Sequence, residues 1–70
     1  MNTILFGARL REVRKRMGLT QYELADMMGT HQGHISRYER GHCLPMLWQL
    51  VRLRTLSGAS LDALVDEVLV

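Results

Sequence analysis

Two consecutive segments decide this fold: Leu19-Thr-Gln-Tyr-Glu-Leu-Ala-Asp-Met-Met-Gly29 and Thr30-His-Gln-Gly-His-Ile-Ser-Arg-Tyr-Glu-Arg-Gly41. In the first segment, Thr20 and Glu23 have the spacing of a capping box, in which each side chain bonds to the backbone amide of the other residue. Leu19 and Leu24 have the spacing of a hydrophobic staple across the same helix start. Gly29 can adopt the left-handed conformation that often ends a helix. The pattern predicts a helix over about residues 21–28.

The second segment predicts another short helix, over about residues 32–39. Ile35 and Tyr38 are about one helical turn apart and should face inward, and Gly41 supplies a second C-terminal stop. Ala25 is small enough to let the two helices approach closely. The two helices and the short turn between them therefore form one packed unit whose outer face is polar and cationic.

The outer face of the second helix carries side chains suited to contacts with DNA. The residues that face outward, at i, i+3, i+4 and i+7, are Gly33, Ser36, Arg37 and Arg40. A short helix exposed in this way commonly enters the major groove. Glutamine can pair with adenine and arginine with guanine, each pair giving roughly 1–3 kcal/mol of discrimination. Gln32 points the same way from the first turn, so the predicted base contacts are Gln32, Gly33, Ser36 and Arg37.

Contacts with the DNA backbone are predicted on both sides of this helix. Gln21 lies at the start of the first helix, where free backbone amides favour an anion. Arg40 and His42 come just after the second helix and should hold the other side, and His34 is a further, secondary contact. For Arg37, and for the basic residues Arg9, Arg11, Lys15 and Arg16 of the first predicted helix, the alternative is an ordinary solvated helix surface.

The region from Leu19 to Gly41 resembles the helix-turn-helix of the lambdoid phage repressor and Cro group and its many small bacterial relatives. The shared landmarks are Gln21, Ala25, Gly29, Ile35 and the run Tyr38-Glu-Arg-Gly41. Ser60-Leu-Asp-Ala-Leu64 resembles the start of the last helix of the group, so the resemblance covers about residues 6–65. It implies an all-α, compact five-helix bundle that forms a single domain over residues 1–70. It also implies a transcriptional regulator that binds double-stranded DNA at an operator, as a Cro-like or controller-like repressor does.

The resemblance also implies an ion pair between Arg14 and Glu39. Arg14 lies on the apolar face of the first predicted helix, one turn from Leu10, and burying an unpaired charge is costly. Members of the group pair this arginine with the acidic residue that closes the recognition helix, which here is Glu39. The alternative is that Arg14 and Glu39 are two unrelated surface charges.

Three residues depart from the pattern of the group. Gly33 stands where a base-reading side chain is usual, so it either permits a close backbone approach or leaves one base pair unread. His31 stands where Ser or Thr normally caps the recognition helix, so Thr30 is expected to take over the cap. Arg54 stands where a small apolar residue is usual, so the fourth helix is expected to be rotated or to end early.

Helices are also predicted before and after this unit. The first covers about residues 3–17, and its apolar face consists of Phe6, Leu10, Val13 and Met17. The fourth begins near Pro45 or Met46 and ends near Leu56 or Ser57. Its expected core contacts are Leu47, Leu50, Val51 and Leu53.

The last predicted helix points to self-association. It follows the cap Ser60, covers about residues 61–69, and carries more apolar positions than a small core can cover. Trp48 lies off the apolar face of the fourth helix and either caps the core edge against the 41–45 loop or forms a dimer contact. Members of the group usually bind palindromic sites as two-fold dimers. The predicted homodimer interface consists of Trp48, Leu61, Val65, Val68 and Leu69.

Size and charge fit a single domain that contacts a polyanion. The chain has 70 residues, one cysteine and a net charge of +2. Residues 1–54 hold nine basic and four acidic side chains, whereas residues 55–70 hold three acidic and no basic ones. This asymmetry suggests a cationic face. One cysteine excludes an internal disulfide, and no apolar run is long enough for a signal or membrane segment, so a soluble cytoplasmic protein is expected.

The sequence offers little support for other chemistry. His31, His34, His42 and Cys43 invite a zinc site, but adjacent residues such as His42 and Cys43 rarely bind one tetrahedral ion. No catalytic set of nucleophile, base and acid can be assembled, so neither an enzyme nor a metal or cofactor is expected.

Two rival functions stay open. One is the DNA-binding antitoxin of a toxin pair, with Trp48 and the C-terminal apolar residues covering the toxin; the other is a protein-interaction module.

Overall fold

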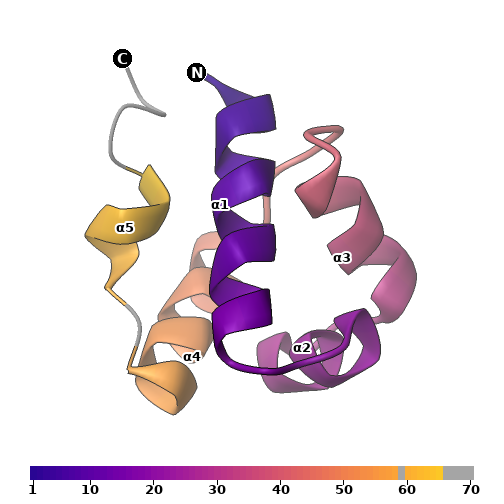
Figure 1. The fold of residues 1–70 in the computed structure, drawn as a ribbon, viewed down its shortest axis with the longest axis vertical. Helices are drawn as coiled ribbons and strands as arrows, with labels where there is room; N and C mark the ends of the chain where they lie inside the picture. Colours follow the sequence, from indigo (N-terminus) through magenta and orange to yellow (C-terminus); the bar gives the residue numbers. More distant parts are fainter. Residues whose placement is uncertain (59, 66–70) are drawn as a thin grey trace.

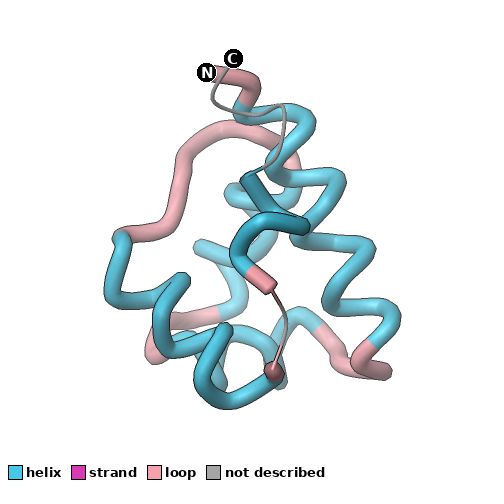
Figure 2. Tube along the Cα trace, turned by 90° about the vertical axis from the view of Figure 1, so that its left-hand side faces the viewer, coloured by secondary structure: helices cyan, strands magenta, loops and turns pink. Residues whose placement is uncertain are grey.

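The computed structural model describes residues 1–58 and 60–65, and all regular structure in these residues is helical (Figures 1 and 2). The helices are α1 (Thr3–Arg16), α2 (Gln21–Met28), α3 (Gln32–Glu39), α4 (Leu47–Ser57) and α5 (Leu61–Val65). The all-α class is therefore confirmed. The predicted last helix extends beyond the described residues, so the count of five complete helices stays a prediction. None of the helices in the described part of the chain has the length and hydrophobicity that a membrane crossing requires.

The start and end of α2 follow from its caps. The Thr20 hydroxyl accepts a hydrogen bond from the Glu23 N–H at 3.1 Å, and the Glu23 carboxylate accepts one from the Thr20 N–H at 2.9 Å. Both bonds of the capping box are therefore present, and each satisfies an amide that the helix itself leaves free. At the other end Gly29 has a φ of 73°, a left-handed conformation that glycine adopts without strain.

The start of α3 differs from the prediction. His31 occupies the N-cap position but its side chain makes no capping hydrogen bond. Thr30 does not take over the cap, because its hydroxyl is 2.6 Å from Nδ1 of His34 and bonds to that ring instead. The prediction of a Thr30 cap was therefore wrong, and α3 begins without any side-chain cap.

The core lies where α1, α2 and α3 meet, with one residue each from α4 and α5. Its buried side chains are Phe6, Leu10, Leu24, Ala25, Met28, Ile35, Tyr38, Leu53 and Leu64. Val13 and Met17 of the predicted apolar face of α1 are only partly buried and pack against its edge. The α1 helix packs against α3 and α5, and α2 packs against α3 and α4 (Figure 1). Burial of these side chains is the main term that favours folding of a chain this small.

The α1 and α3 helices cross at Gly7, a buried residue of α1. A Cβ atom on Gly7 would lie 2.4 Å from the carbonyl oxygen of Tyr38 and 2.5 Å from that of Glu39. Both neighbours are backbone atoms, so they cannot turn aside as a side chain would. The absence of a side chain at residue 7 therefore sets how closely α3 approaches α1.

The inward face of α4 is rotated relative to the prediction. Leu47 and Val51 were expected in the core but are 73% and 44% exposed, whereas Leu53 is buried and Leu50 is half-buried. Gln49 instead points inward: its Oε1 accepts hydrogen bonds from the Tyr38 hydroxyl at 3.2 Å and from the Met46 N–H at 2.9 Å. This amide satisfies two polar groups that would otherwise be left without a partner, which fixes the rotation of the helix.

The crossing at Gly7 gives a stability prediction. Replacing Gly7 with Ala should lower the free energy of unfolding by about 1–3 kcal/mol, because the methyl group would push the α1 and α3 backbones apart. Urea denaturation measures the change. The matched control is Gly33→Ala, whose added Cβ would meet only the His31 side chain, at 3.3 Å. This control should cost less than Gly7→Ala, because an exposed side chain can move by a few tenths of an ångström where a backbone cannot. Equal stability of wild type and Gly7→Ala would contradict the close crossing.

The capping box gives a pH prediction. Hydrogen bonds to the Glu23 carboxylate, first from the backbone N–H of Thr20 and then from its hydroxyl, lower the pKa of Glu23. The folded protein therefore releases this proton more readily than the unfolded chain, so the stabilisation is complete above the unfolded pKa of about 4 and is lost as the pH falls through the folded pKa. The stability difference between wild type and Glu23→Gln should be largest near neutral pH and shrink below about pH 4. Urea denaturation across this range measures it, and a pH-independent difference would contradict the role of the charge.

Candidate nucleic-acid interface

A buried ion pair fixes α3 against α1. The Glu39 carboxylate accepts hydrogen bonds from Nε of Arg14 at 2.7 Å and from Nη2 at 3.1 Å, and Nη1 of Arg14 donates to the Leu19 carbonyl at 3.0 Å. The side chains of Arg14 and Glu39 are only 13% and 4% exposed. The hydrogen bond that the guanidinium donates to the Glu39 carboxylate raises the pKa of Arg14, although burial acts in the opposite direction. The pair that the family resemblance implied is thus present as a bidentate, largely dehydrated contact.

Two glutamines extend this contact to the start of α3. Nε2 of Gln21 donates to Glu39 Oε1 at 3.2 Å, and Oε1 of Gln21 accepts from Nε2 of Gln32 at 2.7 Å. A continuous line of hydrogen bonds therefore runs from Arg14 through Glu39 and Gln21 to Gln32. The two glutamines, predicted as a backbone contact and a base contact, lie next to each other. Gln32 is half-buried, and its Oε1 has no hydrogen-bond partner in the part of the chain that the structure describes.

The outward face of α3 carries two exposed arginines. Arg37 is exposed, and no interaction ties its guanidinium to another residue that the structure describes. Arg40 is also exposed, and its Nε donates to the backbone carbonyl of Ser36 at 3.3 Å. Ser36 and Gly33 are partly exposed on the same helix. His42 follows in the next turn, exposed, with its N–H donating to the Arg37 carbonyl at 3.0 Å.

His34 is placed differently from the other predicted contacts. It is half-buried, with Nδ1 bonded to Thr30, and its ring lies 3.9 Å from the ring of His31 and 6.1 Å from that of Tyr38, measured between ring centroids. This packing leaves His34 less accessible to a phosphate than a solvent-facing side chain would be. The exposed member of the pair is His31, which was not among the residues predicted to contact DNA.

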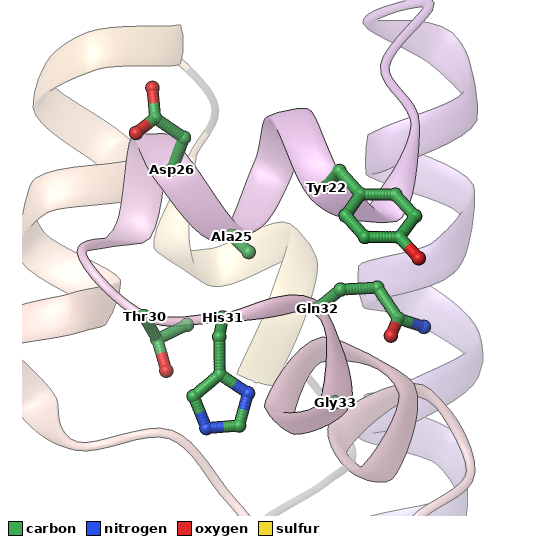
Figure 3. Close-up of a pocket in the computed structure, with 7 residues that line it drawn as sticks. All are labelled: Tyr22, Ala25, Asp26, Thr30, His31, Gln32 and Gly33. Carbon is green, nitrogen blue, oxygen red and sulfur yellow. The ribbon is translucent and has the colours of Figure 1, made fainter.

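An open hollow of about 460 Å³ lies between α2 and the start of α3 (Figure 3). The residues that line it are Tyr22, Ala25, Asp26, Thr30, His31, Gln32 and Gly33. Tyr22 is 73% exposed and stands at the rim, beside Gln21. Tyr22 was not among the residues predicted from the sequence to contact DNA. Its position in the first turn of α2, on a different side of the helix from buried Leu24 and Met28, could have indicated that Tyr22 is exposed there.

The residues predicted for a dimer interface are described only in part. Trp48 is 52% exposed, and its ring lies at the C-terminal end of α2, where a Cβ on Gly29 would be 3.1 Å from Cζ3. Val65 is half-buried and lines a small apolar hollow with Phe6 and Leu50. The Leu61 side chain is not described, and Val68 and Leu69 lie outside the described residues. Exposed apolar side chains near Trp48 in the sequence are Met46, Leu47 and Val51.

Comparison with known proteins gives one family. Residues 10–47 match the sequence model of the helix-turn-helix family. The chain is 39% identical over 62 residues to the SPbeta prophage-derived uncharacterized HTH-type transcriptional regulator YonR of Bacillus subtilis (strain 168), a match that covers 87% of this chain and 56% of that protein. It is 38% identical over 64 residues to the HTH-type transcriptional regulator ImmR of the same organism, covering 89% and 50%. The chain thus spans about half the length of these relatives.

Among solved structures, the chain is similar to the restriction-modification controller protein C.AhdI from Aeromonas hydrophila. The TM-score is 0.79 and the sequence identity 32%, over 89% of this chain and 94% of that one. The likeness therefore extends over the whole bundle and is not confined to α2 and α3.

The ion pair gives a prediction on stability. Glu39→Leu removes the carboxylate and leaves the guanidinium of Arg14 buried without it, which should cost about 3 kcal/mol or more. Glu39→Gln keeps one acceptor oxygen and should cost less. The matched control is Glu12→Ala, which breaks the exposed pair between Glu12 and Arg16 and should cost less than about 0.5 kcal/mol. Urea denaturation compares the three variants, and equal costs for Glu39→Leu and Glu12→Ala would contradict the structural role of the buried pair.

Proposed function

Because the chain belongs to the helix-turn-helix family of lambda repressor and Cro type, we propose that it binds double-stranded DNA sequence-specifically and regulates transcription. The observation that carries the proposal is the hydrogen-bonded line from Arg14 to Gln32. It fixes the first residue of α3 from inside the protein and leaves Arg37 exposed on the same helix. A rigid short helix that offers free polar groups on one side suits the major groove.

Base readout is assigned to the outward residues of α3. Gln32 has a free carbonyl oxygen and one remaining N–H, and together these match the N6 and N7 edge of adenine. The Arg37 guanidinium is free to form two parallel bonds with O6 and N7 of guanine. Ser36 lies between Gln32 and Arg37 in the sequence of α3, and its shorter side chain is assigned a further base contact. Gly33 offers no side chain, so its contribution is a close approach of the backbone.

Contacts with phosphates are assigned to the two ends of this surface. At the N-terminus of α2, a phosphate contact is assigned to Gln21, whose side chain is bonded to Gln32, and to the backbone amides that the cap leaves free. At the end of α3, Arg40 and His42 are exposed cationic or hydrogen-bonding groups. Such contacts set affinity and orientation and do not select a sequence.

The finer proposal is a dimeric regulator of repressor or controller type that recognises a palindromic operator. One domain of this size reads only a few base pairs, and two copies with recognition helices about 34 Å apart would reach successive major grooves. The likeness to a restriction-modification controller protein supports this type of regulator. Exposed Leu47, Trp48 and Val51 offer apolar surface for a second copy. Purification with an unrelated small protein bound to this surface would instead support the antitoxin alternative.

Selection of bound sites from random DNA duplexes tests the proposal most directly. A DNA regulator should enrich one motif, and a palindromic motif would support the dimer. Binding to the selected site should also weaken linearly in a plot of log affinity against log salt concentration, because phosphate contacts release counterions. A chain that enriches no motif, or whose binding does not depend on salt, is not a sequence-specific DNA-binding protein.

The two arginines of α3 give a paired prediction. Arg37→Ala should reduce discrimination by about tenfold at one or two base pairs, because a bidentate base contact is lost. Arg40→Ala should weaken binding to all sequences alike and lower the salt slope by about 1. The matched control is Arg54→Ala, which removes the same charge from the exposed side of α4 and should change neither quantity appreciably. Competition binding with single-base variants of the selected site measures all three, and a uniform loss for Arg37→Ala would contradict the base assignment.

A further inference from the structure

The His31 imidazole lies directly beside the position that a Cβ atom at residue 33 would take. A Cβ atom on Gly33 would lie 3.3 Å from Nδ1 of His31 and 3.4 Å from its Cε1. Figure 3 shows the ring hanging from the turn beside the first turn of α3. Gly33 shares its helical face with Ser36 and Arg37, at i+3 and i+4. The His31 ring therefore belongs to the same outward surface as those two residues, although it comes from the residue before the helix.

The ring is held in this place by contacts that lead back to the core. Its centroid is 3.9 Å from that of His34, with the ring planes inclined by 30°. Nδ1 of His34 is bonded to the Thr30 hydroxyl at 2.6 Å, and the other neighbour of His34 is the ring of buried Tyr38. The hydroxyl of Tyr38 donates in turn to buried Gln49. The exposed His31 ring therefore packs on the ring of His34, which is itself held in place. His31 then loses less side-chain conformational entropy when it makes a contact.

We propose that His31 is a specificity-determining residue, reading a base edge at the position that the missing side chain of residue 33 leaves open. This inference rests on the proposed function. A neutral imidazole has one N–H donor and one acceptor nitrogen, so it can donate to O6 or N7 of guanine or accept from an exocyclic amino group in the major groove. The hollow beside the ring leaves room for the base edge to approach.

The test uses two variants of the exposed residue. His31→Ala removes the ring, whereas His31→Phe keeps a flat ring that can pack on His34 but has no nitrogen. Competition binding is measured for wild type and both variants against the selected site and all of its single-base variants. Both substitutions should reduce the preference at the same one base pair by about fivefold or more while the preferences assigned to Arg37 are kept. Thermal unfolding of the two variants should match wild type, since His31 is exposed.

The outcomes separate this inference from the proposed function. If the wild-type chain selects no motif, the proposed function itself fails. If wild type selects a motif and His31→Ala keeps every base preference, the inference is overturned and the function stands. If His31→Ala weakens binding to all sequences alike, His31 contacts a phosphate and the inference that it reads a base is also overturned. Retention of the preference by His31→Phe alone would show that the ring shape, and not a nitrogen, is read, which also overturns the proposal.

Discussion

The buried carboxylate of Glu39 is the interaction on which the geometry of this protein depends. A carboxylate that is 4% exposed is stable only if charged and hydrogen-bonded partners replace its lost water. Arg14 supplies the charge from α1, and Gln21 supplies a further donor from α2. Both partners reach the carboxylate only when α3 lies in one place. The ion pair therefore acts less as a source of net stability than as a constraint on how three helices are arranged.

Steric contact and hydrogen bonding constrain α3 in different ways. At Gly7 the backbone carbonyls of Tyr38 and Glu39 come so close that no side chain fits, which sets the distance between α1 and α3. The directional bonds of Arg14 to Glu39 then fix rotation and sliding along that crossing, which apolar contacts alone define poorly. Gln32 is bonded through Gln21 to the same carboxylate. The ion pair therefore also fixes the position of the Gln32 side chain, at the first residue of α3.

The sequence predicted the local features of α2 and α3 better than the rotation of α4. The capping box at Thr20 and the left-handed Gly29 are local patterns, and both are present. The inward Gln49 depends on a long-range bond to Tyr38, so apolar periodicity chose Leu47 and Val51 instead. Thr30 has the chemistry of a cap, but a histidine one turn away competes for its hydroxyl. In the candidate site, the positions on α3 could be read from helical spacing, whereas the placement of His31 over Gly33 could not, because it depends on ring packing.

The polar groups of the candidate interface differ in how far the protein orders them in advance. Gln32 is held by Gln21, and His31 rests on His34, so these side chains lose little freedom when they meet a ligand. Arg37 has no such support among the described residues and must be ordered on binding. Fixed groups reject a mismatched base edge because they cannot move away from it, while a free guanidinium can exchange a base for a nearby phosphate. Selectivity should therefore be strictest at the start of α3, where support from the core is greatest, and Arg37 should add discrimination farther along the helix at a larger ordering cost.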